Sequence, residues 1–389
     1  MLILSMRDSL TKFSLLPVPL FILMGEVMFR SGVALRMLNS LDKWIGRVAG
    51  RLSLLAVAAG TLFACMTGSS MASVATLGEL LVPEMEKHGY KKTMTLGPIL
   101  GSGGLAMMIP PSAMAIILGC IAEVSIAKLL LAIIMPGLLL AILSAAYIII
   151  RCRLQPHLAP SYKAPPSALS DKLIDTVRYI LPLGVVIFLV IGVMIMGVAT
   201  PSEAAASGTI GAFILAVAYG GLDWKMVKKS FLSTIEITSM LFCIIMASLT
   251  FGQILAFCGA TRGLIELSLG LPVPPIGIII GTQVVLLILG MFVNPIAIMM
   301  ICIPVFMPIL TTLGFDPIWF LAIFLVNVEL GALTPPFGML LFVMQGVAPN
   351  TTFDDCVRAA FPFMIIDAVA IGIIIAVPSI ALWLPGLIS

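Results

Sequence analysis

Apolar residues in this chain are gathered into long runs, and polar residues lie in the short stretches between them. The runs lie near residues 13–30, 52–67, 71–83, 93–121, 126–150, 179–199, 203–220, 231–258, 273–292, 296–313, 317–347 and 360–385. A helix needs about 20 apolar residues to cross a bilayer, and several of these runs are shorter or are interrupted by glycine and proline. The pattern predicts an all-helical membrane protein in which some helices are broken.

The composition narrows the class of protein. Of the 389 residues, 61% are hydrophobic and 10% are charged, whereas a soluble domain carries about 25% charged residues. The 7 cysteines are scattered, and His88 and His157 lie in polar stretches, so no metal-binding constellation is predicted. The sequence has no Walker loop and no soluble domain that could hydrolyse ATP. We expect a polytopic membrane protein that is not an enzyme and that drives any transport with a gradient.

The basic residues predict which ends of the runs face the cytoplasm. Region 52–83 has basic residues on both sides: Lys43, Arg47 and Arg51 precede it, and Lys87, Lys91 and Lys92 follow it. We therefore expect this region to enter from the cytoplasm, turn at "TGSS" and return as a re-entrant helical hairpin. Residues 272–315 contain no lysine or arginine, as expected for a second hairpin that enters from the outside.

The two halves of the chain carry an internal repeat. A shift of 225 residues (335 minus 110) places the Pro-Pro pair of "MMIPPSAM" on that of "ALTPPFGM", and it places Ser69 on Asn294. Because the two copies begin on opposite sides of the membrane, the repeat is predicted to be inverted. Inverted repeats with interrupted helices are typical of secondary transporters that bind substrate near the membrane midplane.

The interruptions themselves predict a binding site. Irregular backbone deep in a membrane is tolerated only where protein or a cavity covers it. The stretch "GSSMAS" is expected to be the tip of the first hairpin, and "GSGGLAMMIPPS" the broken helix that faces it. Freed carbonyl groups at such breaks can bind a cation, and helix amino termini can bind an anion. Taken alone, Ser69 and Ser70 could instead be hydroxyls at a helix interface.

The chain is predicted to divide into five segments. They are residues 1–50, an amino-terminal scaffold helix and an interfacial helix; 51–150, a first transport repeat with the cytoplasmic-side hairpin; 151–178, a cytoplasmic loop; 179–271, scaffold helices; and 272–389, a second transport repeat with the periplasmic-side hairpin. The first run fits the charge rule only if another helix precedes it. We therefore expect that a helix before residue 1 is missing from this sequence.

The motifs along most of the chain resemble those of the large membrane subunit of tripartite ATP-independent periplasmic (TRAP) transporters. They include "PLFILMGEVMFRSG", "GSSMASVATLG", "VPEMEKHGY", "MIPPS", "ATPSEAAASG", "GMFVNP" and "LTPPFGMLLFV". The resemblance implies a sodium-driven, elevator-type importer of small organic anions such as C4-dicarboxylates or sialic acid, in the bacterial inner membrane. It also implies a small four-helix membrane partner and a soluble periplasmic binding protein. Nucleic acid is not an expected partner, and sodium ions are expected in place of a cofactor.

The repeat and the resemblance together imply the site residues. The sodium ligands are expected among Gly68, Ser69, Ser70, Gly103, Gly104, Pro110, Asn294, Glu329, Gly331 and Thr334. The substrate is expected between the two hairpin tips, against Ser70, Ser73, Ser112, Asn294, Thr334 and Phe337. No arginine within the apolar runs stands out as a clamp for a substrate carboxylate.

Glutamates in or beside the apolar runs include Glu26, Glu203, Glu236 and Glu329. The family commonly has aspartate at the position of Asn294, whereas this chain has Glu329 at the repeat position of Gly104. We hypothesise that the carboxylate has moved across the site; alternatively, the second sodium site is weaker or proton-coupled, or Glu329 is only a buried structural partner. Glu26 and Glu236 are interpreted as structural contacts to another helix or to the small subunit. Glu203 is interpreted as part of a helix cap.

Other functions remain as alternatives. A stand-alone sodium- or proton-coupled organic-anion carrier of similar architecture would need no periplasmic binding protein. An intramembrane hydrolase that uses Ser69 or Ser70 would need an adjacent base, and the nearest candidate, His88, lies in a basic loop at the membrane edge. A channel fits two hairpins and an inverted repeat less well than an alternating-access transporter does.

Overall fold

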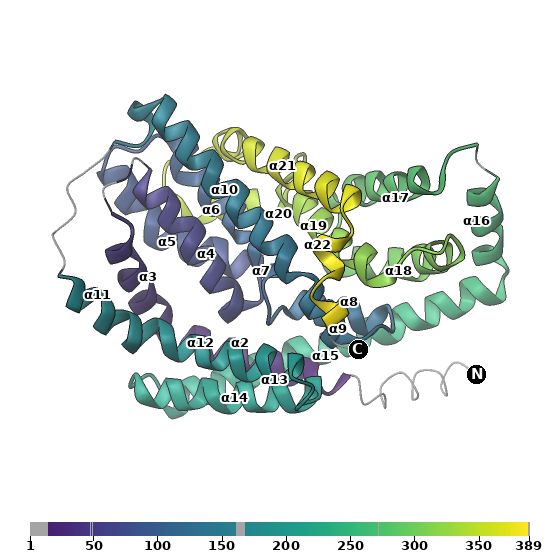
Figure 1. Ribbon diagram of the computed structural model, residues 1–389, viewed down its shortest axis with the longest axis horizontal. Coiled ribbons are helices and arrows are strands. Elements are labelled where there is room, and N and C mark those ends of the chain that lie inside the picture. Colours follow the sequence, from purple (N-terminus) through teal and green to yellow (C-terminus); the bar gives the residue numbers. More distant parts are fainter. Residues whose placement is uncertain (1–14, 47, 49, 161–167, 271, 388–389) are drawn as a thin grey trace.

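The computed structural model describes residues 15–46, 48, 50–160, 168–270 and 272–387 (Figure 1). Every regular element within these residues is a helix. The predicted all-helical class is therefore confirmed. The basic residue Arg47 and residues 1–14 of the predicted amino-terminal segment 1–50 lie outside the described residues.

The helices of the first half follow the predicted runs closely. They are α2 (Pro17–Arg30), α3 (Val33–Trp44), α4 (Arg51–Thr67), α5 (Ser70–Lys87), α6 (Lys92–Gly103), α7 (Leu105–Met108), α8 (Ala113–Ile121), α9 (Ile126–Ala132), α10 (Ile134–Leu154) and the short η2 (Pro156–Leu158).

The middle of the chain contains long helices with local irregularities. α11 (Leu169–Asp175), α12 (Leu181–Ile187) and α13 (Val193–Ile195) are joined by the π-helical turns η3 (Thr176–Ile180) and η4 (Phe188–Gly192). After them come α14 (Pro201–Ala218), α15 (Trp224–Phe257) and α16 (Ala260–Leu269).

The second half repeats the interrupted pattern of the first. Its helices are α17 (Pro275–Gly290), α18 (Pro295–Thr312), α19 (Pro317–Leu333), α20 (Met339–Val347), α21 (Phe353–Ala376), α22 (Ser379–Leu382) and η5 (Pro385–Leu387).

Two groups of helices can be followed in Figure 1. Helices α12, α13, α14 and α15 lie along one side of the molecule, and α2 packs against α14 and α15. On the other side, α6 packs against α4, α5 and α21, and α19 packs against α17 and α21. Helix α2 also contacts α4 and α8, so it lies between the two groups.

Both predicted hairpins are present as helix pairs. Helices α4 and α5 pack together, and Gly68 between them has a φ of +56°, which glycine adopts readily because it lacks a Cβ. Helices α17 and α18 also pack together, and α18 begins with Pro295, a favoured residue at a first helical position. Their entry from opposite sides of a membrane stays a prediction.

The predicted broken helices also occur. The stretches Lys92–Met108 and Ala113–Ile121 are bent by 45° at the break between them. Pro110 and Pro111 lie in this break and have no N–H to donate to a helix. The equivalent break separates α19 from α20 and contains Pro335 and Pro336, and the peptide bond within each Pro-Pro pair is cis. Each repeat therefore pairs one hairpin with one interrupted helix.

Six helical stretches among the described residues are long and apolar enough to cross a membrane. They are Ile126–Leu154, Leu169–Ile195, Pro201–Ala218, Trp224–Phe257, Pro295–Thr312 and Phe353–Ala376, and the bent pair would make a seventh. This number of apolar helices identifies a polytopic membrane protein.

The predicted loop at 151–178 differs from the structure. Helix α10 continues to Leu154, and a helical stretch begins at Leu169 and runs on to Ile195. Arg151 and Arg153 lie in the last turn of α10, where cations interact favourably with the helix dipole. Both ends of the predicted loop are therefore helical, and its location on the cytoplasmic side stays a prediction.

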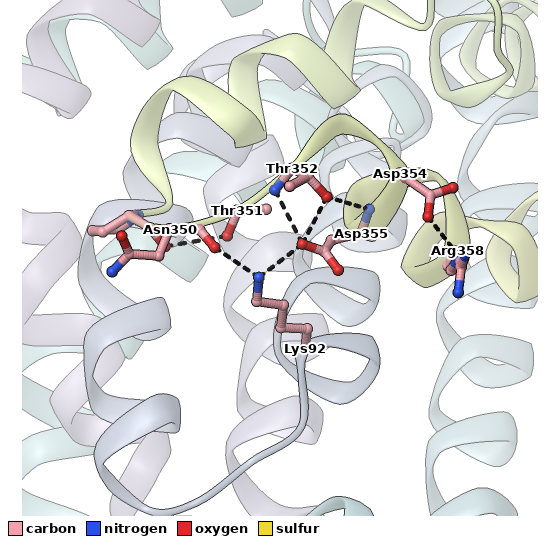
Figure 2. A network of polar contacts seen from close by, with 8 residues as sticks. Lys92, Asn350, Thr351, Thr352, Asp354, Asp355 and Arg358 are labelled. Atoms are coloured by element: carbon pink, nitrogen blue, oxygen red, sulfur yellow. Dashed lines mark hydrogen bonds and ion pairs between the residues drawn. The ribbon is translucent and has the colours of Figure 1, made fainter.

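Polar contacts fix the starts of several helices. Thr200 and Glu203 form a reciprocal capping box at the start of α14, which confirms the interpretation of Glu203. Thr352 and Asp355 form a second capping box on α21. In Figure 2, Lys92 at the start of α6 donates to the Asn350 carbonyl and to Asp355, both at 2.7 Å. This contact ties the first repeat to the start of α21.

Candidate functional site

A cavity of about 270 Å³ lies where the tip of the first hairpin meets α2. We call it the tip cavity. Its lining comes from both groups of helices and comprises Phe21, Ile22, Met24, Gly25, Glu26, Phe29, Arg30, Gly68, Ser69, Ala72, Pro111, Ala113, Met114, Ile117, Ile237, Leu241 and Ile296. Most of these side chains are apolar, and the polar groups are few.

The tip of the first hairpin touches the broken helix, as the sequence predicts. A Cβ added to Gly68 would lie 3.4 Å from the backbone nitrogen of Ala113, the first residue of α8. Gly68 and Pro111 both line the tip cavity. The "GSS" turn and the Pro-Pro break, 42 residues apart in sequence (110 minus 68), are therefore brought together.

Three helices begin at the tip cavity. Ser69 caps α5 and accepts a hydrogen bond from the Ala72 amide at 3.4 Å, and Ala113 and Ile296 lie in the first turns of α8 and α18. The first amides of a helix have no partner within the helix, and this end carries partial positive charge. The cavity is therefore electrostatically suited to an anionic group.

A second, smaller pocket of about 230 Å³ lies at the tip of the second hairpin. It is lined by residues that include Asn294 and Phe337. The side chain of Asn294 accepts a hydrogen bond from the Ile296 amide at 2.9 Å, so it caps α18 just as Ser69 caps α5. The Phe337 ring packs against Phe342 with the ring centroids 5.6 Å apart.

Glu329 is buried against the first hairpin. Its side chain is on α19, yet Oε2 accepts a hydrogen bond at 2.9 Å from the hydroxyl of Ser70, 259 residues earlier. Glu329 is 2% exposed, and its Oε1 has no hydrogen-bond partner among the described residues. A Cβ at Gly104 would lie 2.6 Å from Glu329 Cγ, so the glycine makes room for this carboxyl group.

Asp367 on α21 was missed by the sequence predictions. It is 7% exposed, and its helix α21 packs against α19, the helix that carries Glu329. An ionisable residue within an apolar helix is costly and is a functional candidate by default. The isolated acidic residue in "MIIDAVA" was the available signal, but its proximity to Glu329 depends on the packing of α19 against α21.

The remaining predicted site residues are dispersed. Ser112 caps α8 and donates to the Met107 carbonyl at 2.8 Å, and the Thr334 hydroxyl donates to the Leu330 carbonyl at 2.6 Å. Ser73 is buried, as are Gly103, beside Val74, and Pro110. Gly331 packs against the backbone of Gly290. The structure thus places Gly68 and Ser69 at the tip cavity, Asn294 and Phe337 at the second pocket, and Ser70 and Gly104 beside Glu329. The other predicted residues lie outside these three places, and the role of each residue stays a prediction.

Glu26 forms an ion pair at 2.7 Å with Arg30, one turn along its own helix. The interpretation of Glu26 as a contact to another helix or to the small subunit stays a prediction. Both residues line the tip cavity, although no arginine was expected there. The four-residue spacing, which places both side chains on one helix face, was the signal that could have found this pair. Glu236 is exposed on α15.

An apolar all-helical chain whose interrupted helices begin at a cavity belongs to the class of polytopic membrane transport proteins. The model of the family described as "Tripartite ATP-independent periplasmic transporter, DctM component" matches residues 1–380, and the chain belongs to this family. Permeases of this family lie in the bacterial inner membrane, and they are transporters, not enzymes.

Several relatives of known designation are similar along nearly the whole chain. The C4-dicarboxylate TRAP transporter large permease protein of Pseudomonas aeruginosa is 32% identical and covers 96% of this chain and 86% of its own length. The ectoine large permease of Halomonas elongata has the same identity and coverage. The sialic acid large permease of Vibrio cholerae is 28% identical, covering 98% of this chain and 88% of its own.

The fold has a counterpart among solved structures. The YdaH transporter of Alcanivorax borkumensis superimposes with a TM-score of 0.67 at 17% identity, over 96% of this chain and 87% of the other. This likeness concerns the fold.

Proposed function

We propose that this chain is the membrane-embedded subunit of a sodium-coupled importer that receives a small organic anion from a periplasmic binding protein. The observation that carries the proposal is the tip cavity, where the starts of α5, α8 and α18 meet. Helix amino termini favour an anion without requiring a buried cation. The relatives named for C4-dicarboxylate, sialic acid and ectoine support a small acid as substrate.

Sodium coupling is supported by the buried pair of Ser70 and Glu329. A carboxylate removed from water is costly unless a cation or a proton neutralises it. Glu329 Oε1 has no hydrogen-bond partner among the described residues, and the oxygens of Ser70 and Glu329 are of the type that hard cations prefer. We therefore propose that one sodium ion binds at this pair and another near Asn294.

An elevator movement is supported by the two groups of helices. The amino-terminal segment with α2 and the segment 179–271 with α12, α14 and α15 would form the fixed scaffold. The two hairpins with their broken helices would form the moving unit. The tip cavity lies between these groups. The small membrane subunit and the periplasmic binding protein are proposed from family membership.

The movement predicts a change in distance that spin labels can measure. Labels at Met71, in the first turn of α5, and Val185, in α12, are both placed at exposed positions. We expect two distance populations, whose ratio shifts when sodium and substrate are added. A control pair at Val185 and Ile214, also exposed, should give one population. A single unchanged Met71–Val185 distance under all conditions contradicts the elevator proposal.

The coupling proposal is tested by uptake into proteoliposomes that contain this chain and its small subunit. Sodium gradient and binding protein are each present or absent, and succinate, N-acetylneuraminate, isethionate and ectoine serve as probes. We expect uptake of one probe only when both are present. Uptake without the binding protein, or with a proton gradient alone, would instead identify a stand-alone carrier.

A further inference from the structure

We propose that Arg30 binds the anionic group of the transported molecule in the tip cavity. Without substrate, Glu26 forms an ion pair with the Arg30 guanidinium, and the substrate displaces Glu26 when it binds. This inference rests on the proposed function, because it names the residue that recognises the anion. It is independent of sodium coupling and of the binding protein.

The pair lies on the wall of the cavity. Arg30 Nε and Glu26 Oε2 are 2.7 Å apart, and the two side chains are 32% and 20% exposed respectively. Both belong to α2, and both line the tip cavity together with the hairpin residues Gly68 and Ser69. Partial burial strengthens an electrostatic interaction relative to an ion pair in open water.

The guanidinium of Arg30 has donors to spare. Of its five N–H groups, the one on Nε donates to Glu26. The terminal nitrogens Nη1 and Nη2 have no hydrogen-bond or ion-pair partner within the described part of the chain. The planar fork of an arginine matches a carboxylate in a bidentate geometry. A carboxylate or sulfonate that enters the cavity can therefore first bind the terminal nitrogens of Arg30, and it then displaces Glu26 from Nε.

The rest of the cavity limits the size and character of the ligand. Its volume of about 270 Å³ is just below the range of about 300–1,000 Å³ that is usual for drug-sized ligands. Phe21, Ile22, Met114 and Leu241 supply apolar walls. The ligand that fits this cavity is a small molecule whose anionic group lies beside Arg30 and whose compact apolar part contacts these walls.

The roles of the two residues can be separated because they predict opposite effects. If Glu26 competes with the substrate for Arg30, Glu26→Gln frees the guanidinium and tightens anion binding. Arg30→Gln removes the donor and weakens it. If the pair only stabilises α2, both variants should act in the same direction.

The experiment is equilibrium binding of radiolabelled succinate, isethionate, N-acetylneuraminate and ectoine to the purified protein in lipid nanodiscs, at saturating sodium. A charge-assisted hydrogen bond is worth about 1.5–3 kcal/mol, so Arg30→Gln should raise the Kd of the bound probe about tenfold or more. Arg30→Lys should recover part of this loss. Glu26→Gln should lower the Kd, because a neutral amide competes less strongly than a carboxylate for the guanidinium.

The matched control is Arg358→Gln. Arg358 forms an ion pair with Asp354 at the same four-residue spacing and the same distance of 2.7 Å, but neither residue lines the cavity. The Kd of the Arg358→Gln variant for the bound probe should equal that of the wild type. Equal weakening by Glu26→Gln and Arg30→Gln overturns the proposal, and so does a wild-type protein that binds none of the four probes. If binding follows the expected pattern while uptake needs neither sodium nor a binding protein, the proposed function fails and the assignment of Arg30 stands.

Discussion

Replacing Glu329 by glutamine is expected to raise the sodium concentration needed for half-maximal uptake about tenfold or more. The substitution keeps the shape of the side chain and a hydrogen bond to Ser70 but removes the negative charge that would face the ion. A charge-assisted contact contributes about 1.5–3 kcal/mol, which is at least about tenfold in an equilibrium constant. The measurement is the sodium dependence of initial uptake rates in proteoliposomes.

Two further variants separate the charge of Glu329 from its packing. Ser70→Ala removes the hydrogen bond to Glu329 Oε2 and leaves the carboxylate, so its effect on sodium dependence should be smaller. Glu236→Gln removes an exposed carboxylate from α15 and should leave sodium dependence unchanged. If Glu329→Gln also leaves it unchanged, the carboxylate is not a sodium ligand.

Gly331→Ala is expected to lower the stability of the protein. A Cβ at this position would lie 2.6 Å from the Cα of Gly290. The neighbour is backbone, so α17 and α19 must move apart, and overpacking of this kind costs about 1–3 kcal/mol. Thermal unfolding of the purified protein should show a melting temperature about 1–4 °C lower, because the shift for a given cost falls as the chain becomes longer.

The control for this contact is Gly281→Ala in α17, the helix that carries Gly290. No neighbouring heavy atom lies within 4 Å of a Cβ at Gly281, and alanine is the better helix former by about 1 kcal/mol. Its melting temperature should equal or exceed that of the wild type. A Gly331→Ala protein as stable as the Gly281→Ala protein would show that the two helices are not locked together at this contact.

Much of the fold could be predicted because its features are local in sequence. Gly68 and the two Pro-Pro pairs interrupt helices through their own backbone chemistry, wherever the rest of the chain lies. The repeat offset then paired hairpins with breaks. Helix ends were less predictable: α10 and α11 extend into the polar stretch at 151–178, because charged residues end an apolar run without ending a helix.

The composition of the site was harder to predict because it depends on contacts between distant segments. Ser70 and Glu329 were both named from sequence as candidate sodium ligands, but their hydrogen bond joins the two repeats. The proximity of Asp367 to Glu329 and the position of Arg30 at the cavity follow from helix packing. No pattern within a single run contains that information.

The tip cavity draws its wall from α2 on one side and from the hairpin on the other. If the hairpin moves while α2 stays in place, the substrate can contact Arg30 in only one of the two end states of the elevator movement. Such a fixed anchor cannot alter the net driving force, which the ion gradients set. It changes the relative populations of the loaded states, since a ligand shifts an equilibrium only by its difference in affinity for the two conformations. A single side chain on the stationary helix would then govern how readily cargo is released on one face of the membrane.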